Sequence, residues 1–404
     1  MFIVLSFVLM VTEHLFHYAV GILGVMGITY WLRQVFRAKG LPRPENDLVR
    51  VMMLFLCVFL PMALTLPDAV NPRHATKTTI SYLHFLPAAL YVCVICRAPS
   101  SRNFIGNCLC WLLALLVIDA LVQFFLGHNL LGYPRDTAVL TGMFDNNQRL
   151  GLVLALFLPL ILFSLHRLER FGGWQWLVLL PYAVVILVSL KRSAWVMLVV
   201  GLFLYGLLFL RSLRVDWRMK LLVPLAVIAV IASSAYFIPT VGERLQTTFG
   251  ALSADYETLD IASSRRLTLW STGGEMFLAH PINGVGPRGY RYAYKQFAAE
   301  DDFWIKQNGK GQTHPHLMGL EVLTETGILG FIGLAVFFWV LVRAMFAKRL
   351  SDPQSAVWLA LAVVAWFPLN SHLAFYGSYW STFAWLFIAI GMANSRDSGH
   401  FLFR

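Results

Sequence analysis

The stretch THPHLMGLEVLTETGILGFIGLAVFFWVLV, residues 313–342, joins a polar His-Pro-His segment directly to a long apolar run. A helix needs about 20 mostly apolar residues to cross a membrane, so the run from 317 to 342 predicts a membrane-spanning helix. Histidine titrates near neutral pH and is the most common proton carrier in catalysis. The stretch therefore predicts both a membrane fold and a site for proton transfer where this helix enters the membrane.

The composition extends the membrane prediction to the whole chain. Of its 404 residues, 58% are hydrophobic and 13% are charged, and the mean hydropathy is +0.66. The apolar runs are continuous rather than alternating, which argues against a transmembrane β-barrel and predicts an all-α polytopic membrane protein. We expect 11–12 transmembrane helices, the twelfth only if residues 2–12 form a separate span. The eleven strong spans are 15–32, 48–66, 80–97, 105–127, 150–167, 174–190, 194–210, 220–238, 317–342, 355–371 and 375–393.

The lysines and arginines orient this bundle. The connections on one side, with the C-terminal tail, hold 18 of them, whereas the short connections on the other side hold six: Arg73, Lys77, Arg135, Arg149, Lys191 and Arg192. Cytoplasmic loops are enriched in Lys and Arg, so the first side is assigned to the cytoplasm. The net charge of +11 then reflects loops that face anionic membrane lipids, and no nucleic-acid partner is expected.

One external connection is too long and too polar to be a simple link. Residues 239–316 are also rich in Trp, Tyr and Phe, which predicts an ordered domain rather than a disordered loop. We therefore expect three parts: an N-terminal transmembrane bundle at 1–238, an external loop domain at 239–316, and C-terminal transmembrane helices with a short cytoplasmic tail at 317–404.

Three polar features fall on the external side: His314 and His316, Lys191 and Arg192, and Arg265 and Arg266. A neutral imidazole can take a proton from a hydroxyl. Arginine binds phosphate through a planar fork that keeps its charge, and fixed cations stabilise a departing pyrophosphate. Together the three features predict a site that transfers a group from a lipid pyrophosphate to a hydroxyl.

Each feature also has an ordinary structural explanation. Lys191 and Arg192 are also typical of interfacial side chains at helix ends, and the Arg265–Arg266 pair is also typical of a solvated helix face. A single histidine such as His316 can simply cap a helix or make one structural hydrogen bond. Auxiliary roles are expected for four further residues: His314, Arg288, Asn147 and Glu325.

No metal and no cofactor are expected. The sequence has no Asp-x-Asp pair, and its acidic cluster of Glu300, Asp301 and Asp302 lies in a polar loop. Such a cluster is typically solvated, with a divalent-ion site as the alternative.

Four motifs resemble those of the O-antigen ligase family. The family's histidine motif is a His, usually a small polar residue, nine further residues and then Gly-x-x-Gly. Here His316 is followed by Leu317, nine residues and Gly327-Ile-Leu-Gly330. The spacing matches, but Leu317 replaces the usual small polar residue. SRRLTLW and HPINGVG are similar to its Ser-x-Arg-Leu-x-x-Trp and His-Pro-x-x-Gly-x-Gly, and Arg266 aligns best with its arginine. KRSAW is similar to Ser-Arg-x-x-Trp and places Arg192 on that arginine. GMFDNNQR resembles a Gly-x-Phe-x-x-x-Asn segment, for which a polar helix start is an equal explanation.

The resemblance implies a metal-independent, inverting membrane glycosyltransferase. Such an enzyme moves a polysaccharide from undecaprenyl pyrophosphate to a sugar of the lipid A core, at the periplasmic face of the bacterial inner membrane, without a nucleotide sugar. His316 would be the general base or orient the acceptor hydroxyl. The donor pyrophosphate would be held by Arg192 and Arg266, with Arg265 and Lys191 beside them.

Related functions remain open. An O-antigen polymerase or a protein O-oligosaccharyltransferase would use the same lipid-linked donor, and the short tail of about ten residues after the last span favours the ligase. A transporter or flippase of the same glycan is an alternative of a different class. Transporters carry polar residues deep within spans and internal repeats. Here Glu13 and Asp119 are the main intramembrane charges and no repeat is visible.

Overall fold

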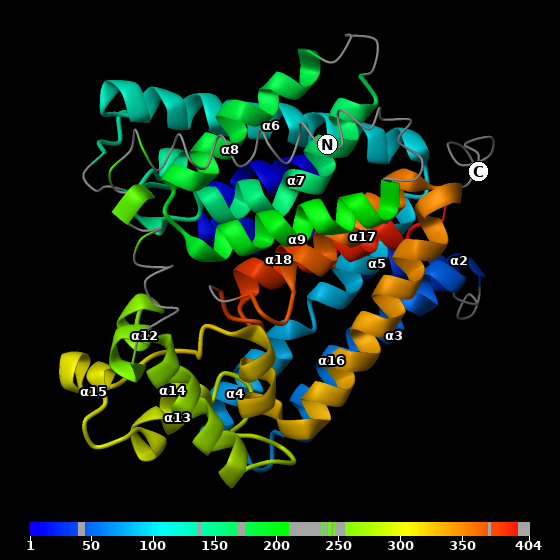
Figure 1. The fold of residues 1–404 in the computed structure, drawn as a ribbon. Coiled ribbons are helices and arrows are strands. Elements are labelled where there is room, and N and C mark those ends of the chain that lie inside the picture. Colours follow the sequence, from blue (N-terminus) through cyan, green and yellow to red (C-terminus); the bar gives the residue numbers. More distant parts are fainter. Residues whose placement is uncertain are drawn as a thin grey trace.

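The computed structural model describes residues 1–38, 45–135, 139–168, 174–209, 255–370 and 373–394, with a few isolated positions between 236 and 246. Within these ranges the chain forms helices and no strand (Figure 1). The predicted all-α polytopic membrane class is confirmed.

Six stretches of helix are long and apolar enough to cross a membrane: α2 (Glu13–Ala38), α3 (Asn46–Leu64), α4 with α5 (Pro72–Tyr82 and Phe85–Ile95), α6 (Pro99–Leu126), α9 (Arg192–Phe209) and α16 (Met318–Ser351). Shorter apolar segments complete the bundle: α1 with η1 (Phe2–Val8 and Leu9–Val11), α7 (Leu150–His166), η4 with α8 (Trp174–Val178 and Leu179–Val188), α17 (Pro353–Ala365) and α18 (Ser378–Met392). Ten of the eleven expected spans coincide with these helices, and 220–238 lies outside the described residues except for the isolated position 236.

Three of the shorter apolar helices occupy the centre of the bundle. Helices α7, α17 and α18 are buried along most of their length, and Trp358 and Trp385 are among the largest fully buried side chains. These helices are surrounded by protein rather than lipid. They can therefore end within the membrane, because non-helical backbone is tolerated at membrane depth where it is buried in protein. The longer helices α2, α6 and α16 present exposed apolar side chains, as a lipid-facing layer requires.

Three boundaries differ from the sequence-based expectation. Residues 2–11 form only a short helix, and the extended backbone of Thr12 separates it from α2. Helix α17 ends at Ala365 rather than 371, consistent with Pro368, which disfavours helix in the residue before it. Helix α16 is interrupted at Gly327, whose φ of 61° and ψ of −157° turn the chain sharply. The expected span 317–342 therefore consists of two helical segments.

Two charges within the bundle are explained by local pairing. Asp119, buried in α6, accepts a hydrogen bond from the Leu130 backbone N–H at 2.9 Å and so holds the chain after α6. Glu13, at the start of α2, pairs with Arg149 at 2.6 Å. These contacts give both carboxylates a structural role.

Helices α12 (Tyr256–Ala262), α13 (Arg266–Ala279), α14 (Tyr290–Phe297) and α15 (Phe303–Asn308) gather at one end of the bundle (Figure 1). Residues 255–316, called the loop domain here, have a hydrophobic core of their own: Leu269, Met276, Val285, Tyr290, Ala293 and Tyr294. Helix α13 packs against α16, so the loop domain is fixed to the start of that helix.

Candidate functional site

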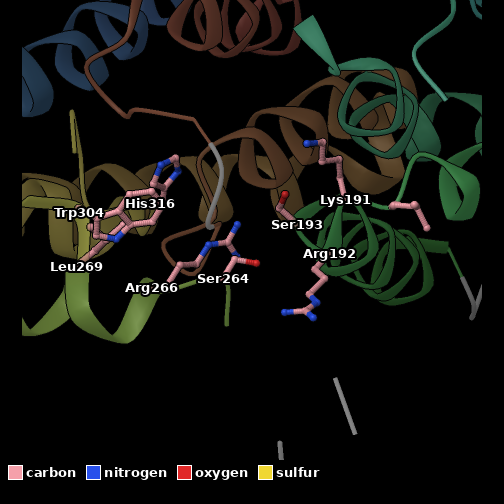
Figure 2. Close-up of a pocket in the computed structure, with 9 residues that line it drawn as sticks. Lys191, Arg192, Ser193, Ser264, Arg266, Leu269, Trp304 and His316 are labelled. Atoms are coloured by element: carbon pink, nitrogen blue, oxygen red, sulfur yellow. The ribbon is translucent and has the colours of Figure 1, made fainter. Parts of the chain in front are cut away.

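One pocket brings together four of the residues expected to form the site. It encloses about 240 Å³ and is lined by Leu190, Lys191, Arg192, Ser193, Ser264, Arg266, Leu269, Trp304 and His316. Figure 2 shows Lys191 and Arg192 on one side of it, at the start of α9, and Arg266 and His316 on the facing side, in the loop domain. Segments more than 120 residues apart in the chain thus form a single cationic pocket with a histidine at its wall.

The bundle side of the pocket is set by a turn between α8 and α9. Leu190 has a left-handed φ of 54°, and Arg192 is the first residue of α9. The Lys191 ammonium donates a hydrogen bond to Gln148 Oε1 at 2.5 Å. The motif GMFDNNQR therefore contacts this side through Gln148. Asn147, the residue expected from the sequence, is exposed and does not line the pocket.

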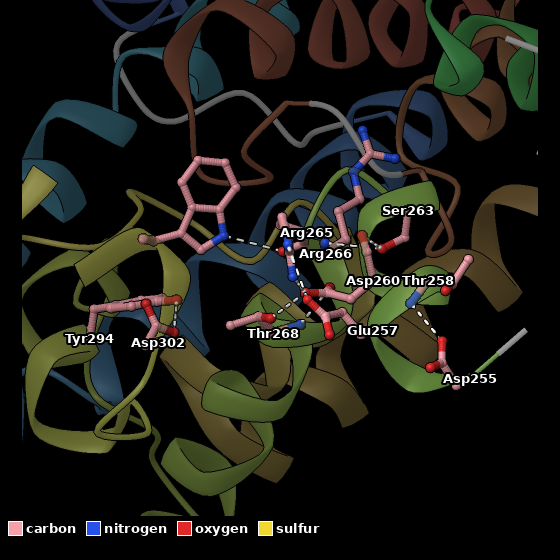
Figure 3. A network of polar contacts seen from close by, with 11 residues as sticks. Asp255, Glu257, Thr258, Asp260, Ser263, Arg265, Arg266, Thr268, Tyr294 and Asp302 are labelled. Carbon is pink, nitrogen blue, oxygen red and sulfur yellow. Dashed lines mark hydrogen bonds and ion pairs between the residues drawn. The ribbon is translucent and has the colours of Figure 1, made fainter. Parts of the chain in front are cut away.

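Arg265 and Arg266 are adjacent but have different surroundings. Ser264 and Arg265 both adopt left-handed backbone, with φ of 65° and 59°. Arg265 lies 3.5 Å from the buried Asp260 carboxylate and 4.0 Å from Glu257, and its guanidinium stacks 4.9 Å from the Phe303 ring. Figure 3 shows Arg265 directed into this network, whereas the Arg266 guanidinium points away from it. Arg266 thus lines the pocket and Arg265 does not.

The buried carboxylate of Asp260 fixes the start of α13. It accepts hydrogen bonds from the Thr268 backbone N–H at 3.1 Å and the Thr268 hydroxyl at 2.6 Å. The Arg266 N–H donates to Ser263 Oγ at 3.1 Å. Side chains that satisfy the free N–H groups of a first helical turn stabilise that turn, so this network determines where the Arg266 side chain leaves the backbone.

His316 lies at a strained point of the backbone. Its φ is 51°, a region uncommon for residues with a Cβ and often occupied at functional sites. After it, the Met318 N–H donates to the Asn370 carbonyl at 3.1 Å. The His314 ring lies 4.0 Å from the His316 ring, but His314 is not among the residues that line the pocket.

Arg288 and Glu325, also expected to assist, belong to a separate buried cluster. Glu325 Oε2 accepts the Arg288 backbone N–H at 2.6 Å, and Arg288 Nη1 lies 3.8 Å from Glu321. Glu321 in turn accepts the Phe375 N–H at 2.9 Å. The pKa of nearby Arg291 is lowered by burial and by the positive charge of Arg288. This cluster fastens the turn after α13 to α16 and does not line the pocket.

The glycines of the two C-terminal motifs allow this fastening. A Cβ at Gly284 would lie 2.6 Å from the Glu325 carbonyl carbon, and one at Gly327 would overlap the Ile282 carbonyl. The close approach permits backbone hydrogen bonds from Val285 to Thr324 at 2.8 Å and from Ile328 to Pro281 at 2.9 Å. Gly327 of the Gly-x-x-Gly motif thus permits docking of the loop domain, close to His316 in sequence but outside the pocket.

The acidic cluster at 300–302 is partly structural. Asp302 is buried, caps α15 by accepting the Ile305 N–H at 2.8 Å, and accepts the Tyr294 hydroxyl at 2.9 Å. In the described part of the chain, no group of three or more His, Cys, Asp or Glu side chains is placed to hold a metal ion. Among the described residues that line the pocket there is no carboxylate either.

Sequence reasoning missed five pocket residues, because serine, leucine and tryptophan side chains in a membrane protein carry no local signal of a site: Leu190, Ser193, Ser264, Leu269 and Trp304. Comparison with protein families then gives a match to the O-antigen ligase model over residues 176–335. This match assigns residues 176–335 to the O-antigen ligase family. The matched segment contains Arg192, Arg266 and His316, so the family match covers the whole pocket. A comparison with curated proteins finds no match.

Members of the O-antigen ligase family are glycosyltransferase-like enzymes that take a lipid-linked glycan and a lipid acceptor. The apolar helices agree with a multi-pass membrane protein. An O-antigen ligase or polymerase type of function follows from the family.

Proposed function

We propose that this protein is an O-antigen ligase of lipopolysaccharide biosynthesis. It transfers polysaccharide from undecaprenyl pyrophosphate to a sugar hydroxyl of the lipid A core, at the periplasmic face of the bacterial inner membrane. The observation that carries the proposal is the single pocket lined by Arg192, Arg266, Lys191 and His316. The proposal retains the three-part division at 1–238, 239–316 and 317–404, with the pocket between the first two parts.

The cations of the pocket suit the donor. Arg192 and Arg266 approach from facing elements, and each guanidinium can bind two phosphate oxygens at once. Lys191 adds a third positive charge, held on Gln148. As the bond between the anomeric carbon and the pyrophosphate oxygen breaks, negative charge grows on the pyrophosphate. Fixed cations stabilise that charge without reorganising.

His316 suits the acceptor. In our proposal its imidazole takes the proton from the acceptor hydroxyl while that oxygen forms a bond to the anomeric carbon. The incoming oxygen attacks opposite to the leaving pyrophosphate, so one displacement inverts the configuration at that carbon. The proton ends on His316 and the electron pair of the broken bond ends on undecaprenyl pyrophosphate. No cofactor takes part, and the arginines perform the role that a divalent ion has in other transferases.

The test is reconstitution of the purified protein in vesicles with lipid-linked glycan and lipid A core. The ligase should form core-linked glycan and release undecaprenyl pyrophosphate in equal amounts. Longer lipid-linked glycans formed without core lipid would instead identify a polymerase, and transfer only to an added protein would identify an oligosaccharyltransferase. Donor that crosses the bilayer with no new bond formed would identify a transporter.

A further inference from the structure

Two tryptophans hold the backbone beside the pocket. Trp270, on α13 one turn after Arg266, donates its indole N–H to the Pro315 carbonyl at 3.1 Å. Trp304, on α15, donates its indole N–H to the Arg265 carbonyl at 3.2 Å. In both cases the acceptor belongs to the residue immediately before a pocket side chain, His316 or Arg266.

The two tryptophans differ in their relation to the pocket itself. Trp304 lines the pocket, so its side chain is placed to touch a bound substrate directly. Trp270 is half-buried in the core of the loop domain and is not among the lining residues. The described contact that links the Trp270 side chain to His316 is its hydrogen bond to the Pro315 carbonyl.

The backbone at His316 needs such support. His316 has a φ of 51°, and Leu317 returns to extended backbone with φ −153° and ψ 109°. A residue with a Cβ keeps a left-handed conformation only when its surroundings hold it there. The backbone on either side is held by the Trp270 indole at the Pro315 carbonyl, by the Glu321 N–H at the Leu317 carbonyl (2.8 Å) and by the Asn370 carbonyl at the Met318 N–H. Between them they fix the direction in which the imidazole leaves the chain.

We propose that Trp270 is a positioning residue for His316. Trp270 and Arg266 share the rigid helix α13, so the indole hydrogen bond sets the imidazole at a constant place relative to the arginine that holds the donor. Trp270 thereby couples the base to the donor site. The inference rests on the proposed function, in which His316 takes the acceptor proton and Arg266 holds the pyrophosphate.

The proposal predicts a specific kinetic change for Trp270→Phe, which keeps an aromatic ring and removes the N–H. Loss of one hydrogen bond together with a small displacement of a catalytic group should lower kcat about tenfold. The KM for donor should stay within about twofold, because Arg192 and Arg266 are untouched. Trp385→Phe is the matched control: it removes a 3.0 Å indole hydrogen bond to the Tyr82 hydroxyl inside the bundle and should leave kcat unchanged.

A second measurement separates positioning from general destabilisation. In a His316→Ala background, Trp270→Phe should add almost no further loss of rate, because no imidazole remains to be positioned. An equal fold-loss in both backgrounds, or a wild-type kcat for Trp270→Phe, would overturn the inference. If Arg266→Ala and His316→Ala are impaired while Trp270→Phe is not, this inference alone fails. If both of those variants are fully active, the proposed function fails as well.

Discussion

Replacing Arg266 with alanine should lower the rate of glycan transfer about 100- to 1,000-fold. Arg266 is a pocket cation on the face opposite Arg192, and its removal takes away charge-assisted hydrogen bonds where the pyrophosphate leaves. Removing one preorganised donor to a developing oxyanion costs about 2.7–4 kcal/mol of transition-state stabilisation, which corresponds to a rate about 100- to 1,000-fold lower. The assay is formation of core-linked glycan in vesicles at saturating acceptor, with donor concentration varied.

Arg265→Ala is the matched control from the next position. Arg265 interacts at 3.5 Å with Asp260 and 4.0 Å with Glu257, and its side chain is 26% exposed. Removing Arg265 leaves the buried Asp260 carboxylate without that charge partner and so costs some stability, whereas loss of the 4.0 Å contact to the exposed Glu257 costs little. Asp260 still keeps its two bonds to Thr268. The variant should therefore fold, and transfer should stay within about threefold of the wild-type rate.

The pair of variants can refute the reasoning as well as support it. A folded Arg265→Ala protein that has lost transfer, beside an Arg266→Ala protein of normal activity, would show that the pocket lined by Arg266 is not the donor site. Wild-type rates for both variants would show that neither arginine of the loop domain takes part in the transfer reaction. Size-exclusion profiles in detergent would establish that each variant is folded.

Arg192→Lys should impair transfer and Arg192→Ala should impair it more, because lysine keeps the charge but lacks the planar fork; donor KM and kcat measure this, and equal activity of the lysine variant would mean that charge alone suffices. Gly327→Ala should prevent stable folding, since φ is 61° and a Cβ would overlap the Ile282 carbonyl, whereas Gly274→Ala, with open space around it, should be tolerated. The test is the yield of monodisperse protein, and a normal yield for Gly327→Ala would contradict the packing described. Ligation should continue in excess EDTA and in Asp301→Asn; activity lost in chelator and restored by magnesium would reverse the metal-independent proposal.

The fold was predictable to the extent that apolar runs mark helices. Ten expected spans recur, since length and hydropathy alone identify them. The sharp turn inside α16 was not predictable, because Gly327 sits in an apolar run where glycine is common. Its left-handed backbone follows from docking of residues 281–286 against it, a tertiary contact that no local pattern contains.

The site was predictable as a set of residue types, but not in its detail. Arg265 and Arg266 are neighbours at a helix start, and their sequence does not show which one enters the pocket. The choice depends on the left-handed turn at Ser264 and Arg265 and on Asp260, which engages the first arginine. Arg288 and Glu325 carry the charges expected of site residues. In the structure, however, the Glu325 carboxylate accepts the Arg288 backbone N–H in a cluster that does not line the pocket.

The central claim is that His316 removes the acceptor proton in a pocket whose arginines hold the donor. The most direct measurement follows release of undecaprenyl pyrophosphate and formation of core-linked glycan by wild-type and His316→Ala protein in the same vesicles, together with the donor affinity of each. We predict unchanged donor affinity and a rate that falls about 100- to 10,000-fold, the range typical for loss of a general base. Near-normal ligation by a folded His316→Ala protein would contradict the account.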